Sequence, residues 1–283
     1  MLLSALIKLN SLDPSLILGS LGRPLQAWVL GQVQRGDAKL AGELHEENSI
    51  RPYTVSTLLD DRGVPLRAQR RLEPGEGCWL RVTSLEDRLS NVLLSRVLPN
   101  LPPSLEIYKM QFRVDGYTLN RYEHPWAGQQ DWRDYAAEPP GPVLPGARLE
   151  FLSPTAFRDK GNDQVLPDPR LVFGSLFERW NAFAPEAMRI DAAWPDFVAR
   201  CVLIDELTRL NSERWIFAGG SRGAATGFTG TVGYRLVSAH KSGQWRSAWD
   251  GAAEVLGVLA DFAFYSGVGH HTTVGMGQTR RLK

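Results

Sequence analysis

The residue types best suited to acid–base chemistry in this chain stand close together near residue 45. His45 lies in a polar stretch, and Arg51 follows it six residues later. A histidine titrates near neutral pH and can give or accept a proton during a reaction. An arginine can neutralise a phosphate group. The two residues are compatible with chemistry at a phosphodiester, although a single histidine in a loop is most often a solvated side chain.

The second informative stretch is the C-terminal segment, in which glycines, histidines and arginines alternate. Its candidate ligand-contacting residues are Gly267, Gly269, His270, His271, Gly275, Gly277, Arg280 and Arg281. Glycine lets backbone N–H groups approach an anion closely, and neighbouring cations favour phosphate. No Gly-Lys-Ser/Thr follows, and an apolar run precedes the glycines, so this is no nucleotide-binding P-loop. The segment fits a phosphate chain such as RNA, or a glycine-rich hairpin that closes a sheet.

Positive charge is concentrated toward the C-terminus. The whole chain of 283 residues carries a formal net charge of +1, but residues 214–283 hold eight Lys/Arg against three Asp/Glu. The same quarter of the chain contains 13 of its 27 glycines. A positive, glycine-rich surface is typical of phosphate contact.

Other chemistries lack support in the sequence. The five histidines show no metal-ligand spacing, so we expect no metal and no other cofactor. Cys78 and Cys201 stand in apolar surroundings and are expected to be buried thiols of an intracellular, cytoplasmic protein. The N-terminus lacks a charged leader region and is broken by Lys8, so neither a signal peptide nor a membrane anchor is expected.

A proline- and glycine-rich stretch, 138–146, predicts a linker between two domains, 1–138 and 147–283. In the first half we expect strands at the N-terminus and over 50–59, 78–82 and 105–114. Helices are expected from Pro24 to Gly36 and over 85–97. This order, strand-helix-strand-strand-helix-strand, is that of a ferredoxin-like domain.

The second half repeats that order loosely. We expect strands over 147–157 and 227–237, and helices over 171–183, 194–210 and 247–264. Residues 272–282 are expected to form the last strand or the arm of a hairpin. The predicted fold class is therefore α+β, with two tandem ferredoxin-like (RRM-like) domains.

Taken together, these blocks resemble a known family. The sequence is similar to the CRISPR-associated endoribonucleases that process repeat precursor RNA, the sixth Cas family of the RAMP superfamily. The resemblance is carried by Leu44-His45, by residues 51–56 (RPYTVS), 151–158 (FLSPTAFR) and 227–234 (GFTGTVGY), and by the terminal loop, in the family's order. The terminal loop is the most specific of these blocks. The family is built from two ferredoxin-like domains, which agrees with the element order above.

The resemblance implies metal-independent cleavage within CRISPR repeat RNA, by attack of a 2′-hydroxyl on the adjacent phosphate. The products are a 2′,3′-cyclic phosphate and a 5′-hydroxyl. His45 matches the family's catalytic histidine, and Arg51 falls where the family often carries a phosphate-stabilising lysine. The first helix lacks the tyrosine that some members use as a second catalytic residue. Tyr53, His270 and His271 are alternatives for the base.

Two other functions remain open at this point. One is a non-catalytic RNA-binding subunit of a CRISPR effector complex, for which other Cas proteins would be partners. The other is an unrelated ferredoxin-like module in which the terminal glycines are only structural. No membrane partner is expected.

Overall fold

The computed structural model describes residues 1–45, 50–137, 146–159, 161–217 and 223–282. Most of the predicted linker, 138–145, lies outside these residues. By internal contacts the chain divides into two units. The first comprises residues 1–130, 215–225 and 271–275, and the second comprises 131–214, 226–270 and 276–283. Two later segments thus belong to the same unit as the N-terminal half.

The first unit is built on a mixed helix and sheet core. Its main strands are β1 (Leu2–Ser11), β3 (Tyr53–Leu59), β5 (Gly77–Ser84), β6 (Ser104–Ile107) and β7 (Met110–Thr118). They form an antiparallel sheet in the order β3-β5-β1-β7-β6, with β8 (Gly128–Gln130) also pairing β1. A two-stranded sheet of β2 (Ser15–Leu16) and β4 (Arg71–Leu72) completes the strands described in this unit.

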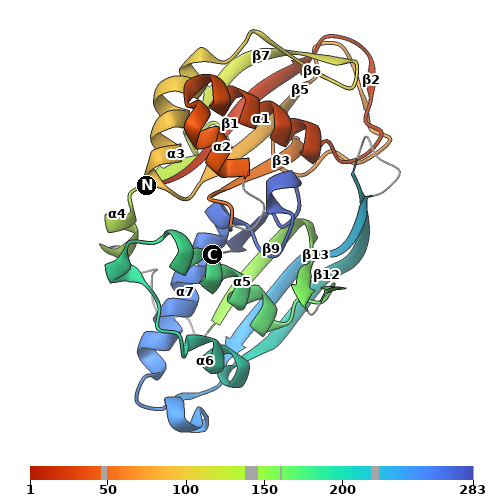
Figure 1. The fold of residues 1–283 in the computed structure, drawn as a ribbon. Coiled ribbons are helices and arrows are strands. Elements are labelled where there is room, and N and C mark those ends of the chain that lie inside the picture. The colour runs from red at the N-terminus through yellow and green to blue at the C-terminus, as the bar shows by residue number, and fades with distance from the viewer. Residues whose placement is uncertain (46–49, 138–145, 160, 218–222, 283) are drawn as a thin grey trace. The chain divides into compact units, whose positions relative to one another are not determined.

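The helices of the first unit cover one face of that sheet (Figure 1). They are α1 (Gly22–Gly36), α2 (Ala38–His45) and α3 (Asp87–Val92), which continues as a π-helical turn, η1 (Leu93–Val97), and a short 3₁₀ turn, η2 (Leu98–Asn100). Alternate residues of β1, such as Leu3 and Ile7, pack with Leu25 and Val29 of α1 in the core. Strand order β3-β5-β1-β7 around two helical crossovers is the ferredoxin-like arrangement, as the sequence predicts.

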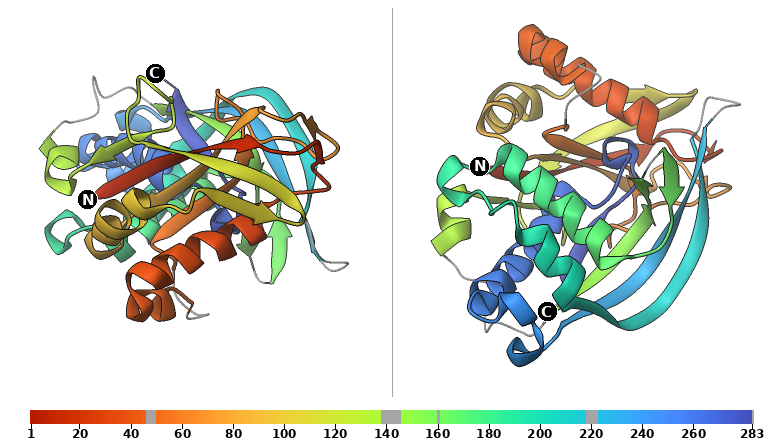
Figure 2. Two further views of the ribbon diagram at one scale, coloured as in Figure 1. Left: turned by 90° about the horizontal axis from the view of Figure 1, so that it is seen from above. Right: turned by 60° about the horizontal axis from the view of Figure 1, so that its bottom comes forward.

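The second unit repeats the arrangement, and two of its strands are longer than those of the first unit. A four-stranded sheet has the order β12-β13-β9-β14, where β9 is Gly146–Thr155, β12 Val202–Ile216, β13 Ala224–Leu236 and β14 Thr279–Leu282. β12 and β13 run side by side as a long curved ribbon (Figure 2). The helices are α4 (Trp132–Ala137), α5 (Pro169–Phe183), α6 (Trp194–Cys201) and α7 (Trp249–Ser266), and β10 (Phe157–Asp159) pairs with β11 (Asn162–Gln164). Short 3₁₀ turns, η3 to η5, cover 186–188, 239–241 and 243–245, and one further turn, η6 (272–274), belongs to the first unit.

Three element predictions are corrected by the structure. The strand expected over 105–114 is a hairpin, because Tyr108 and Lys109 adopt left-handed backbone angles (φ 47° and 67°) and turn the chain between β6 and β7. The helix expected over 194–210 ends at Cys201. The residues after it form β12, where pairing with β13 outweighs their local helical pattern.

The third correction concerns the terminal segment. Only Thr279–Leu282 of the expected strand 272–282 is extended. Thr272–Val274 forms the 3₁₀ turn η6, and Gly275 and Gly277 have φ of 96° and 71°, which an extended strand cannot accommodate. Within the described residues, no helix combines the length and the apolar character needed to cross a membrane.

Candidate functional site

His45 is the last residue of α2, and its side chain is exposed. The helix is positioned at its start by the Asp37 carboxylate, which accepts a hydrogen bond from the Leu40 N–H at 2.9 Å. That bond lowers the pKa of Asp37. Leu40 and Leu44 bury the opposite face of α2 in the core. The sequence suggested a loop at residue 45, but the imidazole is instead presented to solvent from the end of a fixed helix.

Arg51 lies against the end of that helix. Its guanidinium donates to the backbone carbonyl of Leu44, and to that of His45 at 3.4 Å. These are carbonyls of the last turn, which have no partner inside the helix. Arg51 therefore closes α2 and brings a cation beside the backbone of His45. Histidine and arginine, adjacent candidates in the sequence, are also adjacent in the fold.

Tyr53 begins β3 two residues later, but it faces inward. Its side chain is buried, and the hydroxyl accepts a hydrogen bond from the Gln26 side-chain amide of α1 at 2.9 Å. Burial raises the pKa of Tyr53 above its usual value. A buried phenol that holds its proton more tightly is a poor base near neutral pH.

The tip of the C-terminal loop, residues 271–275, belongs to the first unit and packs on α1 and β3. A Cβ on Gly22 would stand 1.8 Å from the Val274 carbonyl oxygen, so only glycine lets α1 begin this close to the tip. A Cβ on Gly275 would stand 3.0 Å from the Thr57 backbone nitrogen, and its φ of 96° also favours glycine. The glycines at both positions therefore permit close backbone packing inside the first unit.

His271 opens this tip and is exposed. Its ring meets the ring of Phe217 edge-on, with centroids 5.6 Å apart. The guanidinium of Arg23, in the first turn of α1, lies 4.5 Å from the centroid of the same Phe217 ring. An imidazole and a guanidinium thus flank one buried aromatic ring. The sequence pattern pointed to neither Arg23 nor Phe217, because only folding brings these distant segments to His271.

The residues that flank the tip belong to the second unit. Val268 donates its N–H to the Gly277 carbonyl at 2.9 Å, and Gly277 donates to the Pro154 carbonyl at 3.0 Å. Gly267, with φ 63°, directly follows Ser266, the last residue of α7. The half-buried imidazole of His270 lies 3.9 Å from the Asp163 carboxylate. These contacts tie both arms of the loop to β9 and its neighbours.

The two terminal arginines are engaged with carboxylates. Arg280 of β14 bonds to Glu150 of the neighbouring β9 at 2.7 Å. Arg281 bonds to Asp261 of α7 at 2.9 Å and to the Gly257 carbonyl at 3.3 Å. Both guanidinium groups thus hold β14 to its neighbours in the second unit.

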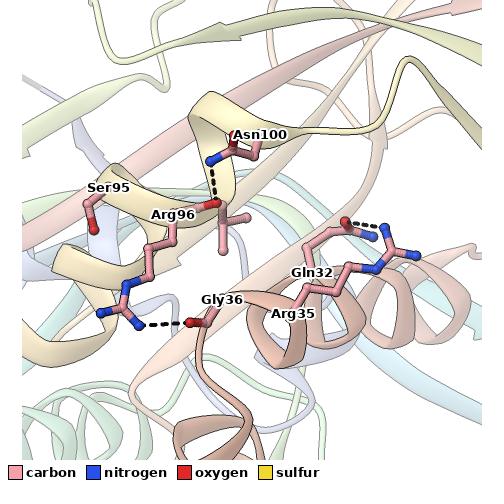
Figure 3. A pocket seen from close by; sticks show the side chains of 7 residues that line it. Gln32, Arg35, Gly36, Ser95, Arg96 and Asn100 are labelled. Atoms are coloured by element: carbon pink, nitrogen blue, oxygen red, sulfur yellow. Dashed lines mark hydrogen bonds between the residues drawn. The ribbon is translucent and has the colours of Figure 1, made fainter.

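A hollow in the first unit lies between the end of α1 and the turns η1 and η2 (Figure 3). It is lined by Gln32, Arg35, Gly36, Ser95, Arg96, Val97 and Asn100. Arg96 donates to the Gly36 carbonyl at 2.8 Å, while Arg35 donates to the Gln32 side chain and its guanidinium points away from Arg96 (Figure 3). The cations do not converge on one point, so we place no ligand there.

The remaining chemical groups are apart from these candidates. Cys78 and Cys201 are buried free thiols, and burial raises the pKa of Cys78 to about 12. Among the residues that the structure describes, no three His, Cys, Asp or Glu side chains are placed to share a metal ion.

Comparison with known proteins gives matches to CRISPR-associated endoribonucleases and to solved Cas6 structures. The family model of the CRISPR-associated endoribonuclease Cas6 matches residues 149–279. The CRISPR-associated endoribonuclease Cas6 of Mycobacterium tuberculosis, in strains CDC 1551 and H37Rv, is 33% identical over 137 residues, which is 47% of this chain. That match spans only 38% of the relatives' own length.

Solved structures match over the entire chain. The product complex of Thermus thermophilus Cas6 (TTHB231) aligns with a TM-score of 0.79 and 28% identity, covering 100% of both chains. The product complex of Cas6 (TTHA0078) aligns with a TM-score of 0.74 and 26% identity, again over 100% of both chains. These matches confirm the family resemblance carried by the sequence blocks, as well as the tandem ferredoxin-like fold.

Proposed function

We propose that this chain is a member of the Cas6 family of CRISPR-associated endoribonucleases and cuts the repeat segments of a CRISPR precursor RNA. The observation that carries the proposal is the full-length match to Cas6 product complexes at 28% and 26% identity. The match of the family model to residues 149–279 supports it independently. RNA is accordingly the proposed substrate and partner.

RNA supplies its own nucleophile, so the enzyme's task is to move protons and balance charge. In the proposed reaction the 2′-hydroxyl attacks the adjacent phosphorus, the bond from phosphorus to the 5′-oxygen breaks, and a 2′,3′-cyclic phosphate and a 5′-hydroxyl result. One proton leaves the 2′-oxygen and one reaches the 5′-oxygen. His45 is exposed at a helix end and accessible to a phosphodiester from solvent, so we assign it to proton transfer.

Arg51 is assigned to the charge that develops on the phosphate. Within the described residues, two of its N–H groups close the end of α2, and a guanidinium carries five donors, so it has further donors to offer a phosphate oxygen. Its fixed attachment to the backbone of His45 would deliver positive charge to the same phosphodiester that the imidazole approaches. A pre-positioned cation stabilises the transition state without having to reorganise first.

Three residues are candidates for the second proton-transfer group, and they differ in exposure. Tyr53 is disfavoured because it is buried, bonded to Gln26 and raised in pKa. His270 is half-buried beside Asp163. His271 is exposed and, like His45, belongs to the first unit, so it is the stronger alternative. We propose His45 as the principal residue and His271 as a contact to RNA.

The proposal is tested by incubating the full chain with the repeat RNA of its own CRISPR array, beside an RNA of the same composition in shuffled order, in EDTA. Cutting of the repeat at one position, with the shuffled RNA left intact, is the expected result. Tight binding of the repeat without cutting would favour a non-catalytic RNA-binding subunit of an effector complex. Absence of both binding and cutting would overturn the proposal.

A further inference from the structure

The loop that follows α7 is held from the side by α5. Arg179 of α5 donates from one guanidinium nitrogen to the carbonyl of Ser266, the last residue of α7. From the other it donates to the Gly269 carbonyl at 2.7 Å. A guanidinium fork reaches two acceptors in one plane, so Arg179 fixes the end of the helix and the start of the loop together.

Ser175 lies one turn before Arg179 on the same face of α5. Its hydroxyl oxygen accepts the N–H of Gly269 at 2.9 Å. Both backbone polar groups of Gly269 are therefore bonded to α5 side chains, four residues apart.

The opposite side of Gly269 is closed by β9 and the residue after it. A Cβ on Gly269 would stand 2.3 Å from the Ala156 carbonyl oxygen, and φ is 79°. The same carbonyl accepts the N–H of His270 at 2.9 Å. The chain thus leaves α7 between α5 and the end of β9, with its direction specified on both sides.

These contacts from other elements matter because the loop is rich in glycine. Glycines at 267, 269, 275 and 277 adopt left-handed angles and leave the free chain many alternatives. Burial lowers the pKa of Arg179 to about 10, which still leaves it charged at neutral pH. A charged, part-buried donor makes stronger bonds to carbonyls than a neutral one.

We propose that Ser175 and Arg179 are positioning residues that set the direction in which the chain leaves α7 toward the tip at 271–275. They touch no reacting atom. Their effect on RNA rests on the proposed function, through the exposed His271 that the tip carries. Without them, the loop samples other directions, and RNA binding must first reorder it.

The experiment compares Arg179→Met, Arg179→Lys and Ser175→Ala with the control Arg200→Met. Arg200 is exposed on α6 of the same unit, so this control removes the same charge from a different helix. Amide hydrogen exchange is measured on the RNA-free proteins. Affinity is measured with repeat RNA carrying a 2′-deoxy nucleotide at the cut site, so that binding is separated from cleavage.

In Arg179→Met, exchange should rise in peptides covering 267–277 and stay unchanged in β9 and β13. The Kd for RNA should rise roughly tenfold, equivalent to about 1.4 kcal/mol. Arg179→Lys, which keeps the charge but not the fork, should recover part of the affinity, and Ser175→Ala should show a smaller rise. Arg200→Met should match the wild type in both measurements. Unchanged loop exchange in folded Arg179→Met and Ser175→Ala variants would overturn the proposal.

A double variant separates positioning from general loss of stability. His271→Asn removes the imidazole while keeping a residue that tolerates the left-handed φ of 58°. If Arg179 acts through the tip, the double variant should raise Kd by less than the product of the two single-variant fold-changes. A rise equal to that product contradicts the proposal. If the wild type binds no repeat RNA, the proposed function fails, and hydrogen exchange alone still decides whether α5 positions the loop.

Discussion

The sequence predicts phosphate contact for two cation-bearing regions of this chain, but the two regions have different roles in the fold. At the end of α2, Arg51 bonds to the carbonyls of Leu44 and His45, and the imidazole of His45 is exposed. In β14, Arg280 and Arg281 bond to Glu150 and Asp261. The first region presents its chemistry outward, and the second uses its charge to hold a strand in place.

Net charge along a sequence therefore does not measure the charge available to a ligand. Residues 214–283 hold an excess of five positive charges. Arg235 also pairs with a carboxylate, Asp205. Arg51 lies outside that basic segment. The carbonyls to which it bonds carry no net charge, so these bonds do not neutralise its positive charge. We therefore expect substitutions in the two regions to have very different consequences for RNA.

The largest expected effect belongs to His45→Ala. Removing a positioned proton-transfer group should slow single-turnover cleavage of repeat RNA by ~10²–10⁴-fold, with Kd close to that of the wild type. Rapid-quench measurement of the cleavage rate at saturating enzyme provides the value. Wild-type cleavage by this variant would remove His45 from the chemistry and would leave His271 as the stronger candidate.

Arg51→Ala should come second. Loss of the guanidinium removes positive charge beside the phosphate and frees the last carbonyls of α2, so cleavage should slow on the order of tenfold. Arg51→Lys should recover part of this rate, because it restores the charge but not the two-pronged contact. If the Arg51→Ala and Arg51→Lys variants cleave equally fast, the positive charge of Arg51 has no role in cleavage, and Arg51 only closes the helix.

The double variant Arg280→Met, Arg281→Met should affect RNA least among the arginine changes. Each partly buried pair contributes about 1 kcal/mol at most, so thermal unfolding should begin at a somewhat lower temperature. RNA affinity should stay within about twofold of the wild type, with the same salt dependence. If these arginines instead neutralise phosphates, the log–log salt slope falls by roughly 0.7 for each phosphate that the variant leaves unneutralised. That outcome would erase the distinction between the two regions.

Tyr53→Phe should have the smallest effect on cleavage. The change keeps the buried ring and removes only a hydroxyl that accepts from Gln26 and whose pKa burial has raised. A single-turnover rate within roughly threefold of the wild type is expected, since a neutral hydrogen bond contributes modestly. A reduction comparable to that of His45→Ala would place the phenol in the chemistry, despite its burial.

Much of the fold could be predicted from periodicity and glycine placement. The strand at the N-terminus and the helix ending at Gly36 are local patterns, and both are found. β12 escaped prediction because its residues gain strand structure only by pairing with β13. The turn at Tyr108 and Lys109 carries no glycine or proline, so no typical turn residue indicates it.

The candidate site could likewise be predicted only where its residues are close together in the sequence. His45 and Arg51 are close in sequence, and both lie in blocks that resemble the family's sequences. Arg23, Phe217 and His271 meet only after folding. Ser175 and Arg179 look like ordinary polar positions on a helix until their bonds to Gly269 are seen. The partners of Arg280 and Arg281 likewise lie in distant segments, so their pairing could not be read from the sequence.

The central claim, an RNA 2′-hydroxyl activated with the help of His45 and without a metal, is tested most directly on one bond. Wild-type protein in EDTA is given repeat RNA and the same RNA with a single 2′-deoxy nucleotide 5′ to the cut. We predict cutting of the first, with a 2′,3′-cyclic phosphate and a 5′-hydroxyl at the new ends, and no cutting of the second at that bond. Cutting of the 2′-deoxy RNA, or activity that EDTA abolishes and Mg²⁺ restores, would contradict the claim.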